Sequence, residues 1–272
     1  MKPFQQLKFP YRTAPREPGV LGALFPDLSF YSRFCLIVFG ASLKARRGLY
    51  GDREWARSSI DTLHALEGVG VGLEITGVEH LKAARTPVVI IGNHMSVMET
   101  CILPGIVHPV RPVTFVVKAS LLQYPFFKHV LRSRHPIAVT RTHARKDLKT
   151  VLEEGTARLE QGISVIVFPQ TTRTHRFDAA KFNSIGVKLA QRAEVPVIPL
   201  ALQTDAWGNG KHIKEFGRID PRKAVRFAFG EPLWVRGRGV DAHQAVIRFI
   251  GDRLERWRSG RTVADRPLRY RN

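Results

Sequence analysis

Cysteine is scarce in this 272-residue chain: only Cys35 and Cys101 are present. Two cysteines cannot form a disulfide framework, and their scarcity fits a reducing compartment. The sequence also lacks the Cys/His groupings that build structural zinc sites, so we expect no metal. Because 44% of the residues are hydrophobic, the chain can bury a real core, which excludes wholesale disorder. The length allows one large domain or two small ones.

Acidic residues are also in short supply. The chain has 23 Asp and Glu against 43 Lys and Arg, a formal net charge of +20. Residues 111–150 alone contain nine Lys or Arg and one Asp, and both ends of the chain are basic. Such a balance indicates an anionic partner: nucleic acid, an acidic membrane surface or a phosphorylated substrate. A solvated basic surface is the alternative for any single stretch.

Long uninterrupted apolar runs are missing as well. Pro3, Pro10, Pro15 and Pro18 leave no room for the apolar core of a secretory signal. The most apolar segment, Leu21–Leu43, is interrupted by Pro26, Asp27 and Arg33, so it falls short of the ~18 residues typical of a confident transmembrane helix. Its aromatic residues, followed by basic ones, favour a helix in a membrane interface, while a helix packed on a soluble core remains equally open.

What the sequence does contain is an alternation of short apolar strands and helices. This pattern predicts an α/β fold with a mostly parallel central sheet flanked by helices. The predicted strands are Val88–Gly92, Val113–Val117, Ile137–Thr140, Ile163–Phe168, Val195–Leu200 and Ala224–Phe229. The predicted helices are Ser96–Ile106, Leu121–Leu131, Arg145–Glu160, Ser184–Arg192 and Ala242–Arg258.

A cluster of glycines at residues 68–77 predicts a boundary in the chain. We expect residues 1–77 to form a basic, membrane-interface helical region and residues 78–272 to form the α/β domain. The cluster lacks the G-x-G-x-x-G spacing of a dinucleotide loop, because Leu73 stands where the third glycine is needed. A Rossmann cofactor site is therefore not expected.

The first candidate site follows the strand that ends at Gly92, where the sequence reads NHMSVME. In open α/β sheets, ligands bind at the carboxyl ends of strands, which is where His94 is expected. If His94 lies before a helix and Glu99 in its first turn, the carboxylate can hold the imidazole in one tautomer and leave the other nitrogen as a base. Ser96 and Glu99 also match a capping box, which is a purely structural alternative.

The second candidate site comprises cations and polar groups at other strand ends. Phe168, Pro169, Gln170, Thr171, Thr172 and Arg173 follow one apolar strand and suit an anion cradle. Lys118 and Arg141 follow two further strands. Taken alone, a Pro/Thr/Arg loop of this kind is more often a polar turn than a binding site.

Taken together and in order, four blocks within residues 85–205 resemble the glycerolipid acyltransferase family. The blocks are NHMSVME for the family's NHxSxxD, KASLLQYPFFKHVLRSRHPIAVTR for its Lys-to-Arg block, FPQTTRT for FPEGTRS, and VPVIP. The resemblance implies His94 as the general base, Glu99 as the carboxylate that orients it, and Arg173, with Lys118 and Arg141, at the acceptor phosphate. It implies transfer from acyl-CoA or acyl carrier protein to a lysophospholipid such as 1-acyl-glycerol-3-phosphate, with no cofactor, at the cytoplasmic face of an anionic membrane as a peripheral or monotopic protein.

Three departures from the family pattern weaken the choice of substrate. Glu99 replaces Asp, Gln170 replaces Glu, and Thr171 replaces Gly. A lipid hydrolase or a non-catalytic lipid-binding relative of the same fold is the alternative. A nucleic-acid-binding protein is disfavoured, because no helix-turn-helix, zinc finger or RNA-binding aromatic motif is apparent.

Overall fold

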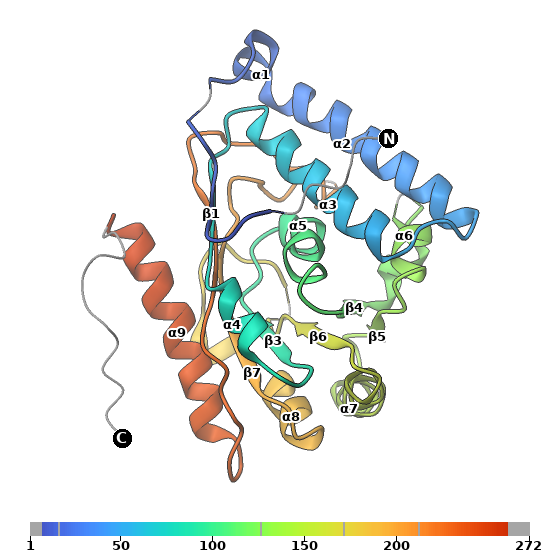
Figure 1. Cartoon of the computed structure of the whole chain (residues 1–272), viewed down its shortest axis with the longest axis vertical. Coiled ribbons are helices and arrows are strands. Elements are labelled where there is room, and N and C mark those ends of the chain that lie inside the picture. The colour runs from blue at the N-terminus through green and yellow to red at the C-terminus, as the bar shows by residue number, and fades with distance from the viewer. Residues whose placement is uncertain (1–6, 16, 126, 171, 212, 261–272) are drawn as a thin grey trace.

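The computed structural model describes residues 7–15, 17–125, 127–170, 172–211 and 213–260. One twisted sheet runs through the molecule with helices packed on both of its faces (Figure 1). Figure 1 also shows α1 and α2 forming the outermost layer at one end, beside α3, while α9 lies at the opposite side of the sheet. The α/β architecture expected from the sequence is therefore confirmed.

The sheet has the strand order β1-β2-β8-β7-β3-β6-β4-β5. Its parallel centre pairs β3 with β6 and β7, β6 with β4, and β4 with β5. The pairs β7/β8 and β1/β2 are antiparallel. The bounds of the strands are β1 Tyr11–Arg12, β2 Leu73–Thr76, β3 Val89–Gly92, β4 Val113–Lys118, β5 Ile137–Val139, β6 Ser164–Val167, β7 Val197–Gln203 and β8 Val225–Phe229.

Apolar side chains of the central strands alternate between two cores, one on each face. Ile90, Ile166 and Ile198 join the core under α2–α5, whereas Val89 and Val165 join the core under α7–α9. Because successive residues of a strand point to opposite faces, strands covered on both sides must be apolar throughout. This requirement explains why the central strands read as short continuous apolar runs.

Nine α-helices occur within the described residues, and four of the five predicted helices coincide with one of them. They are α1 Val20–Leu24, α2 Pro26–Arg46, α3 Asp52–Glu67, α4 Val78–Ala83, α5 Met98–Val107, α6 Lys128–Arg132, α7 Ala144–Glu160, α8 Ile185–Arg192 and α9 Val240–Arg258. The continuous helix expected over Leu121–Leu131 is wrong. That stretch holds a 3₁₀ turn, Ala119–Gln123, and then α6, because Pro125 disfavours helical conformation at Tyr124.

The N-terminal helix α2 is apolar on both its inner and its outer face. Phe30, Phe34 and Val38 are buried against the domain, whereas Leu36 and Phe39 are about 70% exposed. Among the described residues, α2 is the helix that is long and apolar enough to cross a membrane, by length and composition.

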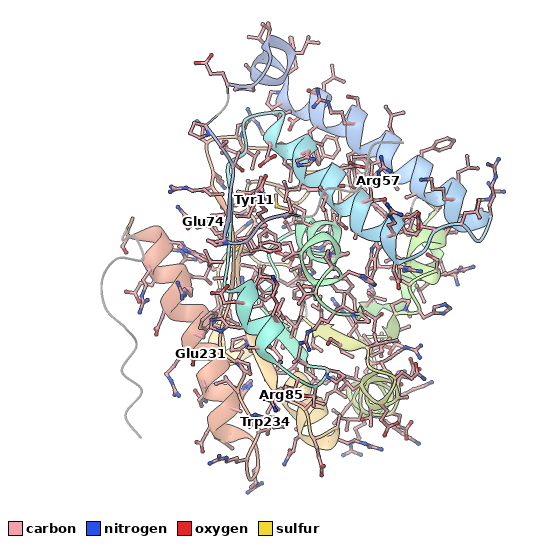
Figure 2. All side chains as sticks on the ribbon, viewed as in Figure 1. Tyr11, Arg57, Glu74, Arg85, Glu231 and Trp234 are labelled. Carbon is pink, nitrogen blue, oxygen red and sulfur yellow. The ribbon has the colours of Figure 1, made fainter. Side chains whose placement is uncertain are left out.

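Residues before and within the glycine cluster contribute to the same sheet as the rest of the chain. Strand β2 pairs in parallel with β8, and β1 adds an antiparallel edge strand in which Tyr11 is opposite Ile75 and Arg12 is opposite Glu74. Figure 2 labels Tyr11 and Glu74 on these two strands. The division at residue 77 stays a prediction about how the chain is organised.

Candidate active site

Loops from five neighbouring strands meet at one edge of the sheet. Strands β3, β4, β5, β6 and β7 run in the same direction, so their carboxyl ends lie on the same side. His94 follows β3, Arg173 follows β6, Arg141 follows β5, and Lys118 is the last residue of β4. Each candidate residue is thereby brought to the edge where open α/β sheets bind ligands.

The loop between β3 and α5 positions His94 through its neighbours. The side chain of Asn93 donates to the carbonyl of Leu202 at 2.8 Å and accepts from the N–H of the same residue at 2.9 Å. This double hydrogen bond fixes the end of β3 to β7. The imidazole of His94 stacks on the ring of Phe168, with centroids 4.5 Å apart, and its Nδ1 contacts the carboxylate of Glu99.

Glu99 is completely buried in the first turn of α5 and receives four donors. Its Oε1 accepts from the N–H groups of Met95 (2.8 Å) and Ser96 (3.0 Å) and from the hydroxyl of Thr204. Its Oε2 contacts His94 Nδ1. The capping interaction and the histidine interaction thus coexist, one on each carboxylate oxygen. A carboxylate surrounded by donors acts only as an acceptor, which places the His94 proton on Nδ1 and leaves Nε2 with a free lone pair.

The loop after β6 is tied to the loop after β3 through Gln170. Its Oε1 accepts from the backbone N–H of His94 at 2.7 Å, while its Nε2 donates to Thr174 Oγ1 at 2.9 Å. The N–H of Thr174 in turn donates to the carbonyl of His94 at 2.9 Å. Gln170 is buried and serves as a clamp behind the site, so the amide that replaces the family's carboxylate has an evident structural use.

The remaining residues of that loop are distributed differently. Phe168 lines the pocket, Pro169 is buried behind it, and Thr172 is exposed. Thr171 lies outside the described residues.

Arg141 is held at the pocket by an unusual backbone conformation. Its φ is +62°, in the left-handed region that residues with a side chain rarely adopt, and such strain clusters at functional sites. The carboxylate of Asp147 secures the turn by accepting from the N–H groups of Thr140 (2.8 Å) and Arg141 (2.6 Å). Burial, together with the charge of nearby Arg173, lowers the pKa of Arg141 from its usual value.

Arg173 forms an ion pair with Glu215, from the segment between β7 and β8. Its Nη2 lies 3.1 Å from Glu215 Oε1, and the two side chains are only 15% and 12% exposed. Its Nη1 is buried and has no hydrogen-bond partner among the described residues. The guanidinium therefore retains a free edge for an anion.

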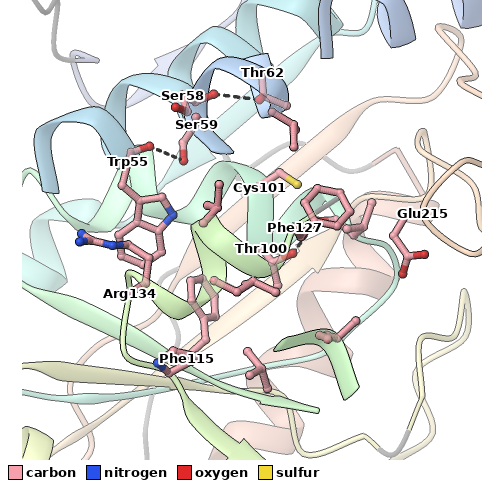
Figure 3. A pocket seen from close by; sticks show the side chains of 18 of the residues that line it. Trp55, Ser58, Ser59, Thr62, Thr100, Cys101, Phe115, Phe127, Arg134 and Glu215 are labelled. Atoms are coloured by element: carbon pink, nitrogen blue, oxygen red, sulfur yellow. Dashed lines mark hydrogen bonds between the residues drawn. The ribbon is translucent and has the colours of Figure 1, made fainter. Parts of the chain in front are cut away.

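One pocket contains these groups and continues into an apolar channel. His94, Lys118, Arg141, Arg173 and Glu215 line it. Most of the other lining side chains are apolar: Phe34, Ile37, Val38, Ala41, Trp55, Val97, Phe115, Val117, Leu121, Phe127, Val130, Leu131 and Phe168. Figure 3 shows Glu215 at one end and Trp55 with Arg134 at the other.

Aromatic rings mark the course of the channel. Phe168 stacks on His94, Phe115 lies 6.3 Å from Phe168, and Trp55 lies 6.0 Å from Phe115, all between ring centroids. Arg134 closes the Trp55 end, where it pairs with Asp52 at 2.6 Å and covers the indole ring at 5.4 Å. The channel thus runs from a cationic, histidine-containing end to an aromatic end.

Hydroxyl groups on α3 also border the channel, but they already donate hydrogen bonds within the protein. Ser59 and Thr62 donate to backbone carbonyls of their own helix at 3.1 and 2.8 Å (Figure 3). This wall therefore exposes few unpaired donors to an apolar ligand.

Sequence reasoning missed three residues that complete the site: Thr204, Asn93 as a clamp, and Glu215. Thr204 and Glu215 come from more than 100 residues further along the chain than Glu99, and no local pattern connects them. A strand followed by Gln203-Thr204 at the same sheet edge was the available signal for Thr204. Within the described residues, no three His, Cys, Asp or Glu side chains gather as metal ligands would.

The chain is similar in sequence to acyltransferases. Residues 72–203 match the family model described as Acyltransferase. The 1-acyl-sn-glycerol-3-phosphate acyltransferase of Pseudomonas aeruginosa is 28% identical, over 80% of this chain and 79% of its own. The human 1-acyl-sn-glycerol-3-phosphate acyltransferase alpha is 25% identical over 52% of this chain, which spans about half (49%) of that relative.

The fold has a solved counterpart. The crystal structure of the 1-acyl-sn-glycerophosphate acyltransferase of Thermotoga maritima superposes with a TM-score of 0.64, at 18% identity, covering 87% of this chain and 96% of that one. In sequence and in fold, this chain is therefore similar to glycerolipid acyltransferases.

Proposed function

We propose that this protein transfers a fatty acyl group from an acyl thioester to the free hydroxyl of 1-acyl-glycerol-3-phosphate. The observation that carries the proposal is the shared pocket: His94, oriented by Glu99, faces the same cavity as Lys118, Arg141 and Arg173. A base and a cluster of cations in one pocket suit a substrate that has both a hydroxyl and a phosphate. The names of the relatives point to the same acceptor.

In the proposed reaction, Nε2 of His94 takes the proton of the acceptor hydroxyl as its oxygen attacks the thioester carbonyl. The carbon–sulfur bond then breaks, and the departing thiolate receives the proton from His94. Glu99 stabilises the imidazolium that forms between these steps. A positioned base of this kind contributes about 10²–10⁴-fold in rate.

The pocket has a cationic part and an apolar part, and these suit the two ends of the substrates. The guanidinium groups of Arg173 and Arg141 and the ammonium of Lys118 suit the phosphate. The apolar channel from Phe168 to Trp55 suits an acyl chain. Either acyl-CoA or acyl carrier protein supplies the thioester in this proposal.

A membrane interface is the natural location for such lipids, and α1 and α2 present an apolar surface suited to it. Leu21, Leu24, Leu28, Leu36 and Phe39 are exposed, and Lys44, Arg46 and Arg47 follow at the end of α2. We place this surface on an anionic, cytoplasmic leaflet, where each basic residue near the lipid contributes about 1 kcal/mol.

Membrane binding is tested by co-flotation with vesicles containing phosphatidylglycerol. Replacing both Leu36 and Phe39 with Asp should reduce the bound fraction severalfold. Replacing Val240, an equally exposed apolar residue on α9, with Asp should not. Equal binding of all three proteins would exclude this surface.

Activity is tested with the purified full chain, a long-chain acyl-CoA or acyl carrier protein, and a panel of lysophospholipids. Thiol release and lipid product are followed together. Thiol release should require 1-acyl-glycerol-3-phosphate, vanish in His94→Ala, and persist in His64→Ala, an exposed histidine of α3. Release without any acceptor would indicate a hydrolase, and no release would argue against catalysis.

A further inference from the structure

Glu215 is an unexpected group to find in an anion-binding pocket. Among the lining residues that the structure describes, it is the one carboxylate, and it forms an ion pair with Arg173. A carboxylate at this position competes electrostatically with any anion that approaches Arg173. Its presence therefore calls for a functional account.

The position of Glu215 is fixed by the fold and does not depend on the ion pair alone. Its backbone carbonyl accepts from Nε1 of Trp207 at 3.0 Å. Trp207 is fully buried and packs edge-to-face on Phe30 and Phe34 of α2, with centroids 4.7 and 4.9 Å away. This aromatic cluster thus fixes the backbone of Glu215 and holds its carboxylate beside Arg173.

Local charge pairing explains what the carboxylate does. The carboxylate of Glu215 offsets the charge of Arg173 within the pocket, as Asp52 offsets that of Arg134 at the other end. A phosphate monoester carries about −1.5 to −2 at neutral pH, so Glu215 repels it while Arg173 attracts it.

The neutral Gln170 supports this account. The resembled motif has a carboxylate there, and the present chain instead uses an amide buried behind the site. Glu215 returns a negative charge to the side of the pocket where Arg173 lies.

We propose that Glu215 is a specificity-determining residue that keeps the binding of the acceptor phosphate moderate. The acylated product retains the same phosphate, so a site in which no carboxylate offset Arg173 would hold the product tightly as well as the substrate. Glu215 weakens the binding of both the substrate and the product and thereby speeds product release. This inference rests on the proposed function for its substrate and on the ion pair for its mechanism.

The test compares Glu215→Gln with Asp205→Asn. The amide oxygen introduced by Glu215→Gln can still accept from Arg173, so the variant removes charge with little change of shape. Asp205 lies in the same segment, pairs with Lys223 at 2.9 Å, and does not line the pocket. Asp205→Asn therefore replaces a carboxylate with an amide outside the pocket and serves as the matched control.

In Glu215→Gln we expect the KM for 1-acyl-glycerol-3-phosphate and the Ki for inorganic phosphate to fall about five- to tenfold. We also expect kcat to fall and thiol release to begin with a burst, while the KM for the donor stays near the wild-type value. All of these constants should stay near wild type in Asp205→Asn. Glu215→Asp, which retains the charge, should stay within about threefold of the wild type. An unchanged or higher acceptor KM in Glu215→Gln overturns the inference.

A measurement without catalysis separates this inference from the proposed function. Inorganic phosphate should raise the Tm of Glu215→Gln more than that of the wild type, and the shift should be lost in Arg173→Gln. If the wild type shows no acyl transfer, the proposed function fails, and the phosphate shifts alone decide the role of Glu215. Equal shifts in wild type and Glu215→Gln overturn it.

Discussion

Replacing Glu99 with Gln should disable the proposed base, His94, while leaving the pocket intact. The four groups around the carboxylate are all donors: the N–H groups of Met95 and Ser96, the Thr204 hydroxyl and the protonated Nδ1 of His94. An amide has one acceptor oxygen and one NH₂ donor, so one side must oppose a donor. If the oxygen keeps the three contacts near Ser96, the NH₂ faces His94 and forces the tautomer that protonates Nε2.

The magnitude follows from these contacts. Loss of a correctly oriented base costs about 10²–10⁴-fold in kcat, equivalent to about 2.7–5.5 kcal/mol of activation free energy. Replacing charge-assisted hydrogen bonds at a fully buried position should also lower the free energy of unfolding by about 2–3 kcal/mol.

The assay is steady-state thiol release at saturating substrates, with urea unfolding of each variant to confirm that the protein is folded. The double variant His94→Ala/Glu99→Gln should be no slower than His94→Ala, because the two side chains act as one unit. Thr204→Val removes one donor from the other oxygen and should cost much less. A Glu99→Gln enzyme within threefold of wild type, or a fully additive double variant, would refute the orienting role.

Three further results are expected from the structure. Asp147 secures the turn that carries Arg141. Although desolvation opposes its ionisation, hydrogen bonds from Thr140 and the Arg141 N–H hold the pKa of its carboxyl below the usual range. Asp147→Asn should therefore be less stable than the wild type at pH 7, and urea titrations should show this difference in stability closing below about pH 4, where the wild type loses the contribution of the ionised carboxylate. Trp207→Ala should lower the free energy of unfolding by about 3–5 kcal/mol, measured by urea denaturation, because the indole is fully buried between α2 and the segment after β7; a cost below about 1 kcal/mol would contradict that packing. Trp55→Ala should extend the aromatic end of the channel and shift the preferred acyl donor to longer chains in a competition assay, whereas an unchanged preference would show that the chain does not reach this end.

The fold was largely predictable because its signals are local. Buried strands such as Val89–Gly92 and Ser164–Val167 need apolar runs, and these stand out in the sequence at the predicted places. Strand β2 was missed because its four residues, Leu73–Thr76, lie inside the glycine cluster. The helix expected over Leu121–Leu131 shows the opposite error, in which apolar spacing outweighed the effect of Pro125.

The site was predictable only where residues follow strands. His94, Lys118, Arg141 and Arg173 could be placed at the same sheet edge because parallel strands share a direction. The partners Thr204 and Glu215 arrive from distant segments, and their contacts depend on the sheet order, which the sequence alone does not give. The sequence places Gln170 in an anion cradle, whereas its contacts make it a clamp between two loops.

Helix α2 separates the apolar channel from the outside by the thickness of a single helix, about 10 Å. Its inner side chains Phe34 and Val38 line the channel, while Leu36 and Phe39 face outward. For an enzyme docked on a bilayer, a hydrocarbon tail would pass from lipid to protein beside this helix without being wetted. Exposing a sixteen-carbon tail to water costs about 12 kcal/mol at about 0.8 kcal/mol per methylene, so a dry route of this kind would remove one of the largest barriers to substrate capture.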